Sequence, residues 1–179
     1  YAPAQIVRDA REHDVEVRPV CVNASYWDNV IEPDGRGGLA LRLGFRQIKN
    51  MCEEEVRWIC AARGNGYTEV EDMWRRAGTP PHVLETLAEA DAFASVNDNR
   101  REALWHAKAV KGEEPLPLFK NELEGEGSVE LPITLPKMSE GEQVVEDYVS
   151  MQLTLRAHPL ALLRPLLTPP NGQIEDVVK

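Results

Sequence analysis

The chain has 179 residues, of which 42% are hydrophobic, 28% are charged and only 6% are aromatic. This length suits one ordinary domain, or one domain with a tail, and is too short for a (β/α)₈ barrel or a two-domain dinucleotide-binding enzyme. The net charge of -10 argues against a dedicated nucleic-acid binder, whose affinity comes largely from phosphate neutralisation. The acidity is uneven, because residues 1–111 carry a net charge of -3 and residues 112–179 carry -7.

Targeting and redox signals are few. No run of about 18 apolar residues is present, so we expect no transmembrane helix. Three cysteines argue against a disulfide framework and favour a reducing cytoplasm. The chain starts without Met or a leader, so we expect Tyr1 to be a cut into a longer protein.

The first 45 residues are predicted to form a helix followed by short strands. A stripe of apolar residues at helical spacing predicts a helix over Pro3–His13. Three valines predict a short strand around Pro19, and the Pro- and Gly-rich stretch 32–38 predicts a loop. Four apolar residues then alternate with smaller or polar ones, namely Leu39, Leu41, Leu43 and Phe45. This alternation predicts a half-buried strand with these four on its buried face.

A series of short helices is predicted next. A short turn of helix around Ile48 precedes a helix that begins at Glu53 and ends at 64–66. Three more follow, the first capped by Thr68, the second opened by 79–81 and the third capped by Asp98 or Asn99. Because each helix buries little surface alone, we expect one compact helical cluster.

The last third of the sequence changes character. Residues 112–136 are rich in Glu, Pro and Gly without periodicity, which predicts an extended acidic arm. Ser139 and Glu142 form a capping box that predicts a helix, and Pro159 opens a last short helix through Leu163. The expected fold class is therefore mainly α with a small β element, an extended acidic arm and C-terminal helices.

The residues give little support for an enzyme or a metal site. The four histidines are scattered over separate elements, and Cys52 and Cys60 lie eight residues apart, which favours core packing over zinc binding. The glycine-rich stretch 35–38 lacks the Lys-Ser/Thr of a phosphate loop. Three glutamates at 53–55 suit a solvated first helical turn better than a metal site. We therefore predict no catalytic and no metal-binding residue in this chain.

The run Leu39–Arg63 is the most informative part of the sequence. It reads as a strand, a short helix, a tight turn and a second helix. Such a turn can point backbone N–H groups at a phosphate, which gives binding without sequence preference. Five basic residues surround it, namely Arg42, Arg46, Lys49, Arg57 and Arg63, and the three glutamates offset part of their charge.

Several segments, taken in order along the chain, resemble the bacterial family C DNA polymerases, which include the DNA polymerase III alpha subunit. The matching segments are 1–13, 15–20, 22–25, 39–49, 66–74, 87–93, 100–105 and 153–160. The sequences Arg-Pro-Val at 18–20 and Arg-Arg-Glu-Ala-Leu-Trp at 100–105 are closest to the error-prone branch, which acts in mutagenic damage repair. The resemblance covers nearly the whole chain.

The resemblance implies a domain order and a role. Residues 1–45 would be the end of the fingers with short β-strands, and 46–111 a tandem helix-hairpin-helix domain. Residues 112–138 would be the acidic arm, and 139–179 C-terminal helices leading towards an OB-fold. The family's catalytic carboxylates lie upstream, so we expect this chain to be non-catalytic, with no cofactor of its own, in a parent polymerase that uses Mg²⁺. The tandem hairpins would contact the backbone of primer–template DNA.

Both hairpins depart from the family's Gly-hydrophobic-Gly pattern. The first hairpin is Lys49–Glu53 and the second is Glu89–Ala92. The residues expected to contact DNA are Arg46, Lys49, Asn50, Met51 and Cys52. Asn tolerates the left-handed conformation that the turn needs, whereas Cys does so poorly. Asp91 would repel phosphate, so we expect the second hairpin to pack against the first and not to bind DNA.

A short apolar motif follows the helical cluster. The sequence Pro-Leu-Pro-Leu-Phe at 115–119 resembles the Gln-Leu-x-Leu-Phe peptide by which bacterial polymerases dock on the sliding clamp. The clamp-binding residues would be Leu116, Pro117, Leu118 and Phe119. The alternative is that Leu118 and Phe119 pack on the chain's own core. A second alternative for the whole chain is a module that docks accessory mutagenesis proteins without touching DNA.

Overall fold

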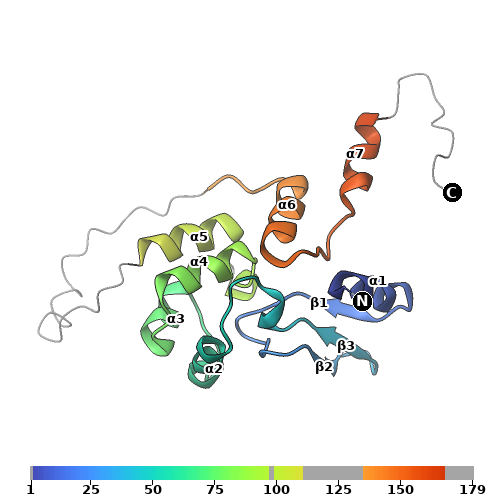
Figure 1. Ribbon diagram of the computed structural model, residues 1–179. Coiled ribbons are helices and arrows are strands. Elements are labelled where there is room, and N and C mark those ends of the chain that lie inside the picture. Colours follow the sequence, from blue (N-terminus) through green and yellow to red (C-terminus); the bar gives the residue numbers. More distant parts are fainter. Residues whose placement is uncertain (1, 97–98, 111–134, 168–179) are drawn as a thin grey trace, which may run out of the picture.

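The computed structural model describes residues 2–96, 99–110 and 135–167. Most of these residues form short helices, and a small three-stranded sheet lies near the N-terminus (Figure 1). The expected fold class, mainly α with a small β element, is confirmed. The clamp-like motif at 115–119 and most of the predicted acidic arm lie outside the described residues.

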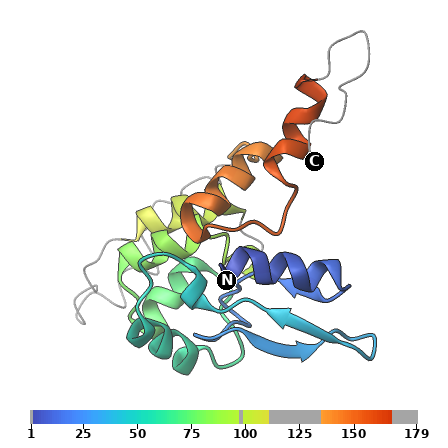
Figure 2. The same cartoon turned by 45° about the vertical axis from the view of Figure 1, so that its right-hand side comes forward.

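The N-terminal part is one helix packed on the sheet. Helix α1 spans Pro3–Glu12, and strands β1 (Glu16–Arg18), β2 (Val30–Pro33) and β3 (Leu39–Arg42) follow. The strand order is β1-β3-β2, with β1 parallel and β2 antiparallel to the central strand β3. Figure 2 shows α1 lying along the strands.

Two details of the sheet correct the sequence prediction. Strand β2 includes residues 32 and 33, which were predicted to be loop, because Pro is tolerated on an edge strand. The predicted buried face is right at Leu43 and Phe45, which are 1% and 0% exposed, and wrong at the start of the strand, where Leu39 is 65% exposed and Ala40 is 1% exposed. Leu39 pairs with Pro33 at the turn end of the β2–β3 hairpin, next to the connecting residues 34–38.

The helical cluster forms the core, as expected. It contains α2 (Glu53–Ala62), α3 (Val70–Ala77), α4 (Pro81–Glu89) and α5 (Arg100–Ala109), with the short 3₁₀ helices η1 (Phe45–Gln47) and η2 (Ala94–Val96). Large, fully buried side chains come from η1, α2, α3, α4 and the turn after α4, and include Phe45, Ile59, Met73, Leu84, Leu87 and Phe93. One contiguous apolar core therefore holds the short helices together.

The helix caps follow local sequence signals with one exception. Of the two residues predicted to cap α5, the structure selects Asn99, whose side chain accepts hydrogen bonds from the N–H groups of residues 101 and 102. Thr68 is not the cap of α3, because the helix begins after Glu69 and the Thr68 N–H itself donates to Asp72 (3.3 Å). The N-cap residue Glu69 makes no side-chain cap hydrogen bond, and the contact to Asp72 ties the residue before the cap to the first turn of α3.

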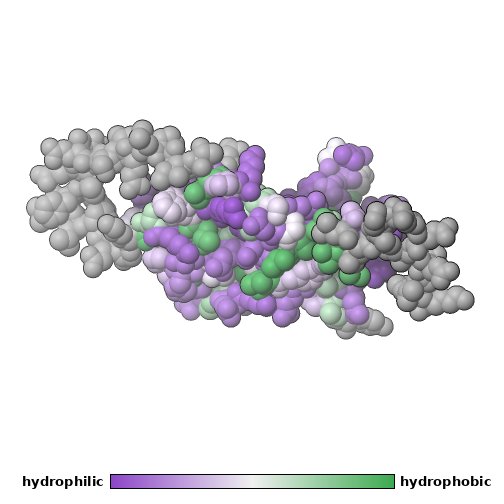
Figure 3. All heavy atoms as spheres, turned by 90° about the horizontal axis from the view of Figure 1, so that it is seen from above, coloured by the Kyte–Doolittle hydropathy of each residue, from purple (hydrophilic) through white to green (hydrophobic). Residues whose placement is uncertain are grey.

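Two helices complete the described part. Helix α6 spans Glu140–Met151 and starts with the predicted capping box, and α7 spans Pro159–Leu167, one turn longer than expected. Large apolar side chains are exposed on both helices, and Figure 3 shows hydrophobic patches among hydrophilic residues on the upper face. Within the described residues, no helix has the length and apolar character needed to cross a bilayer.

Candidate nucleic-acid interface

The first hairpin is a tight turn between η1 and α2. Asn50 adopts the left-handed conformation with φ +61°, which is the position where the family pattern has glycine. Ile48 is 3% exposed and anchors the turn in the core. Cys52 has φ -100° and ψ 136°, an ordinary extended conformation. The backbone cost that we expected at Cys52 is therefore absent, because only Asn50 needs positive φ.

The turn leaves a set of backbone donors open. The N–H of Lys49 donates to the carbonyl of Ser150 (2.9 Å). The next three N–H groups, from Asn50 to Cys52, find no acceptor in the described part of the chain. Cys52 is the N-cap of α2 and makes no side-chain cap hydrogen bond. These donors sit at the positive end of the α2 dipole, where an anionic oxygen is the favoured partner.

The positive charges near this turn are partly neutralised by ion pairs. Lys49 is exposed and forms no ion pair with any residue that the structure describes. Arg46 pairs with Asp28, and both side chains are more than half exposed. Glu53 is paired with Arg57 along α2 (2.7 Å), so one of the three glutamates is neutralised within the helix. Lys49, which is exposed and has no ion pair among the described residues, directly precedes the open N–H groups in the chain.

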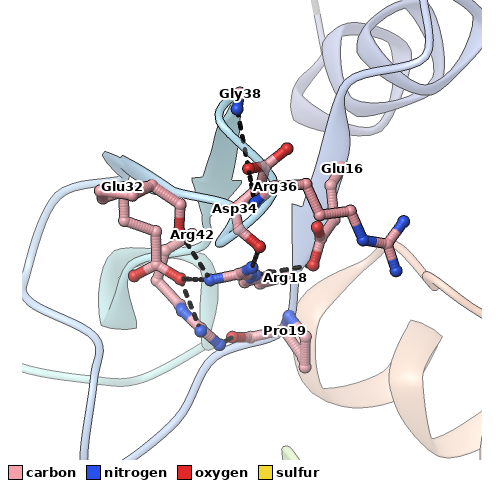
Figure 4. A network of polar contacts seen from close by, with 9 residues as sticks. Glu16, Arg18, Pro19, Glu32, Asp34, Arg36, Gly38 and Arg42 are labelled. Carbon is pink, nitrogen blue, oxygen red and sulfur yellow. Dashed lines mark hydrogen bonds and ion pairs between the residues drawn. The ribbon is translucent and has the colours of Figure 1, made fainter.

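Two of the five predicted basic residues serve the fold instead. Arg42 and Arg18 share the carboxylate of Glu32, at 2.7 and 2.6 Å, and Arg42 also donates to the carbonyl of Pro19 (Figure 4). The hydrogen bond from Arg42 is the main cause that holds the pKa of Glu32 below its usual range. Arg63 is buried and donates to the carbonyl of Ser25. Its guanidinium also stacks on the ring of Tyr26. The basic cluster read from the sequence is thus not one surface.

The second hairpin points its acidic residue inward. Asp91 has φ +57°, so it too occupies the left-handed position of a hairpin turn. Its carboxylate accepts a hydrogen bond from Arg156 (2.7 Å), and burial raises its pKa, which Arg100 and Arg156 oppose. The turn also accepts a hydrogen bond from the N–H of Val22 through Ala92 (2.9 Å). The predicted phosphate repulsion is therefore reduced, because Asp91 is committed to an internal partner.

One segment connects both hairpins, and sequence reasoning missed it. We call residues 147–156, the end of α6 and the stretch after it, the strap. Besides the Lys49 and Asp91 contacts, its Leu155 carbonyl accepts a hydrogen bond from Arg11 of α1 (3.1 Å). Asp147 of the strap forms a buried ion pair with Arg100 at the start of α5. The capping box predicts the start of α6, but no local signal in the sequence predicts these long-range partners.

The chain's described residues hold no group of three or more His, Cys, Asp or Glu side chains that could bind a metal ion. The open N–H groups and the exposed Lys49 lie together at the first hairpin.

Comparison with known proteins identifies the family of the chain and its relatives. Residues 14–103 match the model of the helix-hairpin-helix motif, a motif that binds DNA. The chain is 63% identical over 167 residues to the error-prone DNA polymerase of Ruegeria pomeroyi, covering 93% of this chain and 15% of that protein. It is 51% identical over 172 residues to error-prone DNA polymerase 2 of Rhizobium meliloti, covering 92% of this chain and 16% of the relative. The chain belongs to the helix-hairpin-helix family and, over most of its length, is a homologue of error-prone DNA polymerases.

Proposed function

We propose that this chain is a non-catalytic segment that positions duplex DNA in an error-prone DNA polymerase of translesion synthesis and damage-induced mutagenesis. The observation that carries the proposal is the first hairpin, where three N–H groups and the Lys49 ammonium have no partner in the part of the chain that the structure describes. The helix-hairpin-helix match and the polymerase relatives support it. Nucleotide transfer and its Mg²⁺ ions belong, on this proposal, to other parts of a cytoplasmic parent polymerase.

The hairpin suits a backbone contact that ignores base sequence. Backbone N–H groups and one ammonium group bind phosphate oxygens and carry no base-specific information. A polymerase that copies damaged templates needs such a sequence-independent contact, because the bases in its template vary. The net charge of -10 keeps the contact weak, so it would position DNA that is held elsewhere.

A salt titration with charge-reversal variants tests the DNA contact. We expect Lys49→Glu to weaken binding of a fluorescent duplex, measured by anisotropy at low salt, and to reduce the salt slope by about 1. Lys108→Glu, which makes the same charge change on the exposed last turn of α5, is the matched control and should bind as the unmodified chain does. Equal binding by all three proteins would remove Lys49 from the interface.

We further propose that the 115–119 motif docks the polymerase on the sliding clamp through Leu116, Pro117, Leu118 and Phe119. The support is the motif itself, since an apolar peptide can fill a preformed pocket through a few anchors. Binding to a bacterial clamp should be lost in Leu118→Ala/Phe119→Ala while circular dichroism stays unchanged. Retained binding, or a loss of helicity in the variant, would return both side chains to the chain's own core.

The alternative function is docking of accessory mutagenesis proteins without DNA contact. The net charge and the Asp28–Arg46 pair favour it, because both lower the positive potential near the first hairpin. Under this alternative the duplex titration shows no specific binding even at low salt, whereas a phosphate contact gives a steep dependence on salt.

A further inference from the structure

A pocket of about 330 Å³ lies beside the first hairpin, between the start of α2 and the turn that joins α3 to α4. Its walls include Glu54, Glu55 and Trp58 on one side and Thr79 and Pro80 on the other. This volume is at the lower end of the roughly 300–1,000 Å³ of small-ligand sites, which fits one side chain of a partner. The DNA proposal uses only the rim of this pocket, at Cys52.

Trp58 offers its ring to solvent at this pocket. Its residue surface is 64% exposed, although α2 turns Val56 and Ile59 into the core. A large exposed indole loses solvation only when a partner covers it, and its face is the best aromatic surface for a cation. The position of Trp58 in a pocket wall therefore points to a ligand.

The charge of the pocket lining indicates the charge of that ligand. Glu54 is exposed and makes no ion pair with residues in the described ranges, and Glu55 has only the exposed His82 imidazole at 3.7 Å. No Lys or Arg is among the residues that line the pocket. Two carboxylates beside an indole face attract a cation.

Thr79 adds an independent sign of a missing partner. The residue is 3% exposed, and its Oγ1 atom is buried without a hydrogen bond. An unpaired buried hydroxyl destabilises a protein, so this wall of the pocket holds a hydrogen-bonding group that no described residue uses. Gly78, with φ +62°, ends α3 and sets the turn that carries Thr79.

We propose that this pocket receives an arginine side chain from a peptide segment of a partner protein. A guanidinium group can stack flat on Trp58 while its N–H groups donate to the Glu54 and Glu55 carboxylates, which a point-like ammonium does less well. A stacked DNA base would lack the positive charge that the two carboxylates require. The proposal goes beyond DNA positioning and does not depend on it.

The test follows the indole N–H of Trp58 in nuclear magnetic resonance spectra of the ¹⁵N-labelled chain. N-acetyl-arginine amide should give a saturable shift with a Kd of about 1–10 mM, as expected for one exposed side chain. N-acetyl-citrulline amide has nearly the same shape without the charge and should give no saturable shift. Glu54→Gln should weaken arginine binding several-fold, and Trp58→Leu should abolish it as read at the Thr79 amide.

The controls separate this site from the DNA proposal. Trp105→Leu removes another exposed tryptophan, 49% exposed on α5, and should leave arginine binding unchanged. Lys49→Glu should also leave it unchanged, whatever that variant does to duplex binding. The proposal fails if arginine gives no saturable shift, if citrulline matches it, or if a thymidine oligonucleotide shifts Trp58 and arginine does not.

Discussion

The ion pair between Arg100 and Asp147 offers a demanding test of how the strap is held. Both side chains are nearly inaccessible, at 3% and 6% exposure. Asp147 also accepts a hydrogen bond from the Thr154 hydroxyl (2.6 Å) and lies 3.5 Å from Nε of Arg156. The carboxylate thus joins α5, α6 and the strap at one buried point.

Removing this carboxylate leaves a buried cation without its partner. We expect Asp147→Ala to lower the free energy of unfolding by about 3–5 kcal/mol, the usual cost of breaking a buried pair from one side. Without Asp147 the Arg100 guanidinium keeps the hydrogen bond from Nη1 to the Gln143 carbonyl (2.9 Å), while its Nε atom has no hydrogen bond within the described residues, so the positive charge loses its ion-pair partner. Against a total of roughly 5–15 kcal/mol for a domain, the loss is large.

Urea unfolding followed by circular dichroism measures the effect. The double variant Arg100→Met/Asp147→Leu replaces both charges with apolar groups and should lose less than Asp147→Ala alone. A loss below about 1 kcal/mol in Asp147→Ala, or a double variant as unstable as the single one, would refute the reasoning.

Two further predictions concern the sheet and the first hairpin. Glu32→Gln should cost about 1–3 kcal/mol at neutral pH, because two arginines lose a charged acceptor. The folded pKa of Glu32 lies below its unfolded value of 4.5, so this contribution is present above that value and is lost as pH falls through the folded pKa. Urea unfolding at several pH values should show the two proteins converging in acid, and a constant gap would contradict the assignment. At φ +61°, Asn50→Gly should be nearly neutral, whereas Asn50→Val should cost about 1–2 kcal/mol; equal melting temperatures would speak against the left-handed turn.

Local signals in the sequence predicted the features that depend on neighbouring residues. The capping box of Ser139 and Glu142 and the cap at Asn99 placed two helix starts correctly, because these bonds span only three residues. The turn at Asn50 was likewise recognisable from a residue type that tolerates positive φ.

Features that depend on distant partners could not be read in the same way. The strand β2 is defined by its pairing with β3, and the stretch 32–38 showed only turn residues. Arg42 and Arg63 looked like DNA-facing charges, yet their partners lie 10 and 38 residues away and turn them into structural groups. The inward orientation of Asp91 depends on Arg156, 65 residues further along the chain.

The hydrogen bond from Lys49 to the strap gives the first hairpin an uneven exchange behaviour. The amide of Lys49 is held by the Ser150 carbonyl, while the amides of the next three residues have no acceptor among the residues described. In deuterated solvent the three open amides should therefore exchange within the dead time, and the Lys49 amide should wait for the strap to detach. The exchange rate of the Lys49 amide, next to three fast-exchanging amides, would then report how often α6 separates from the hairpin.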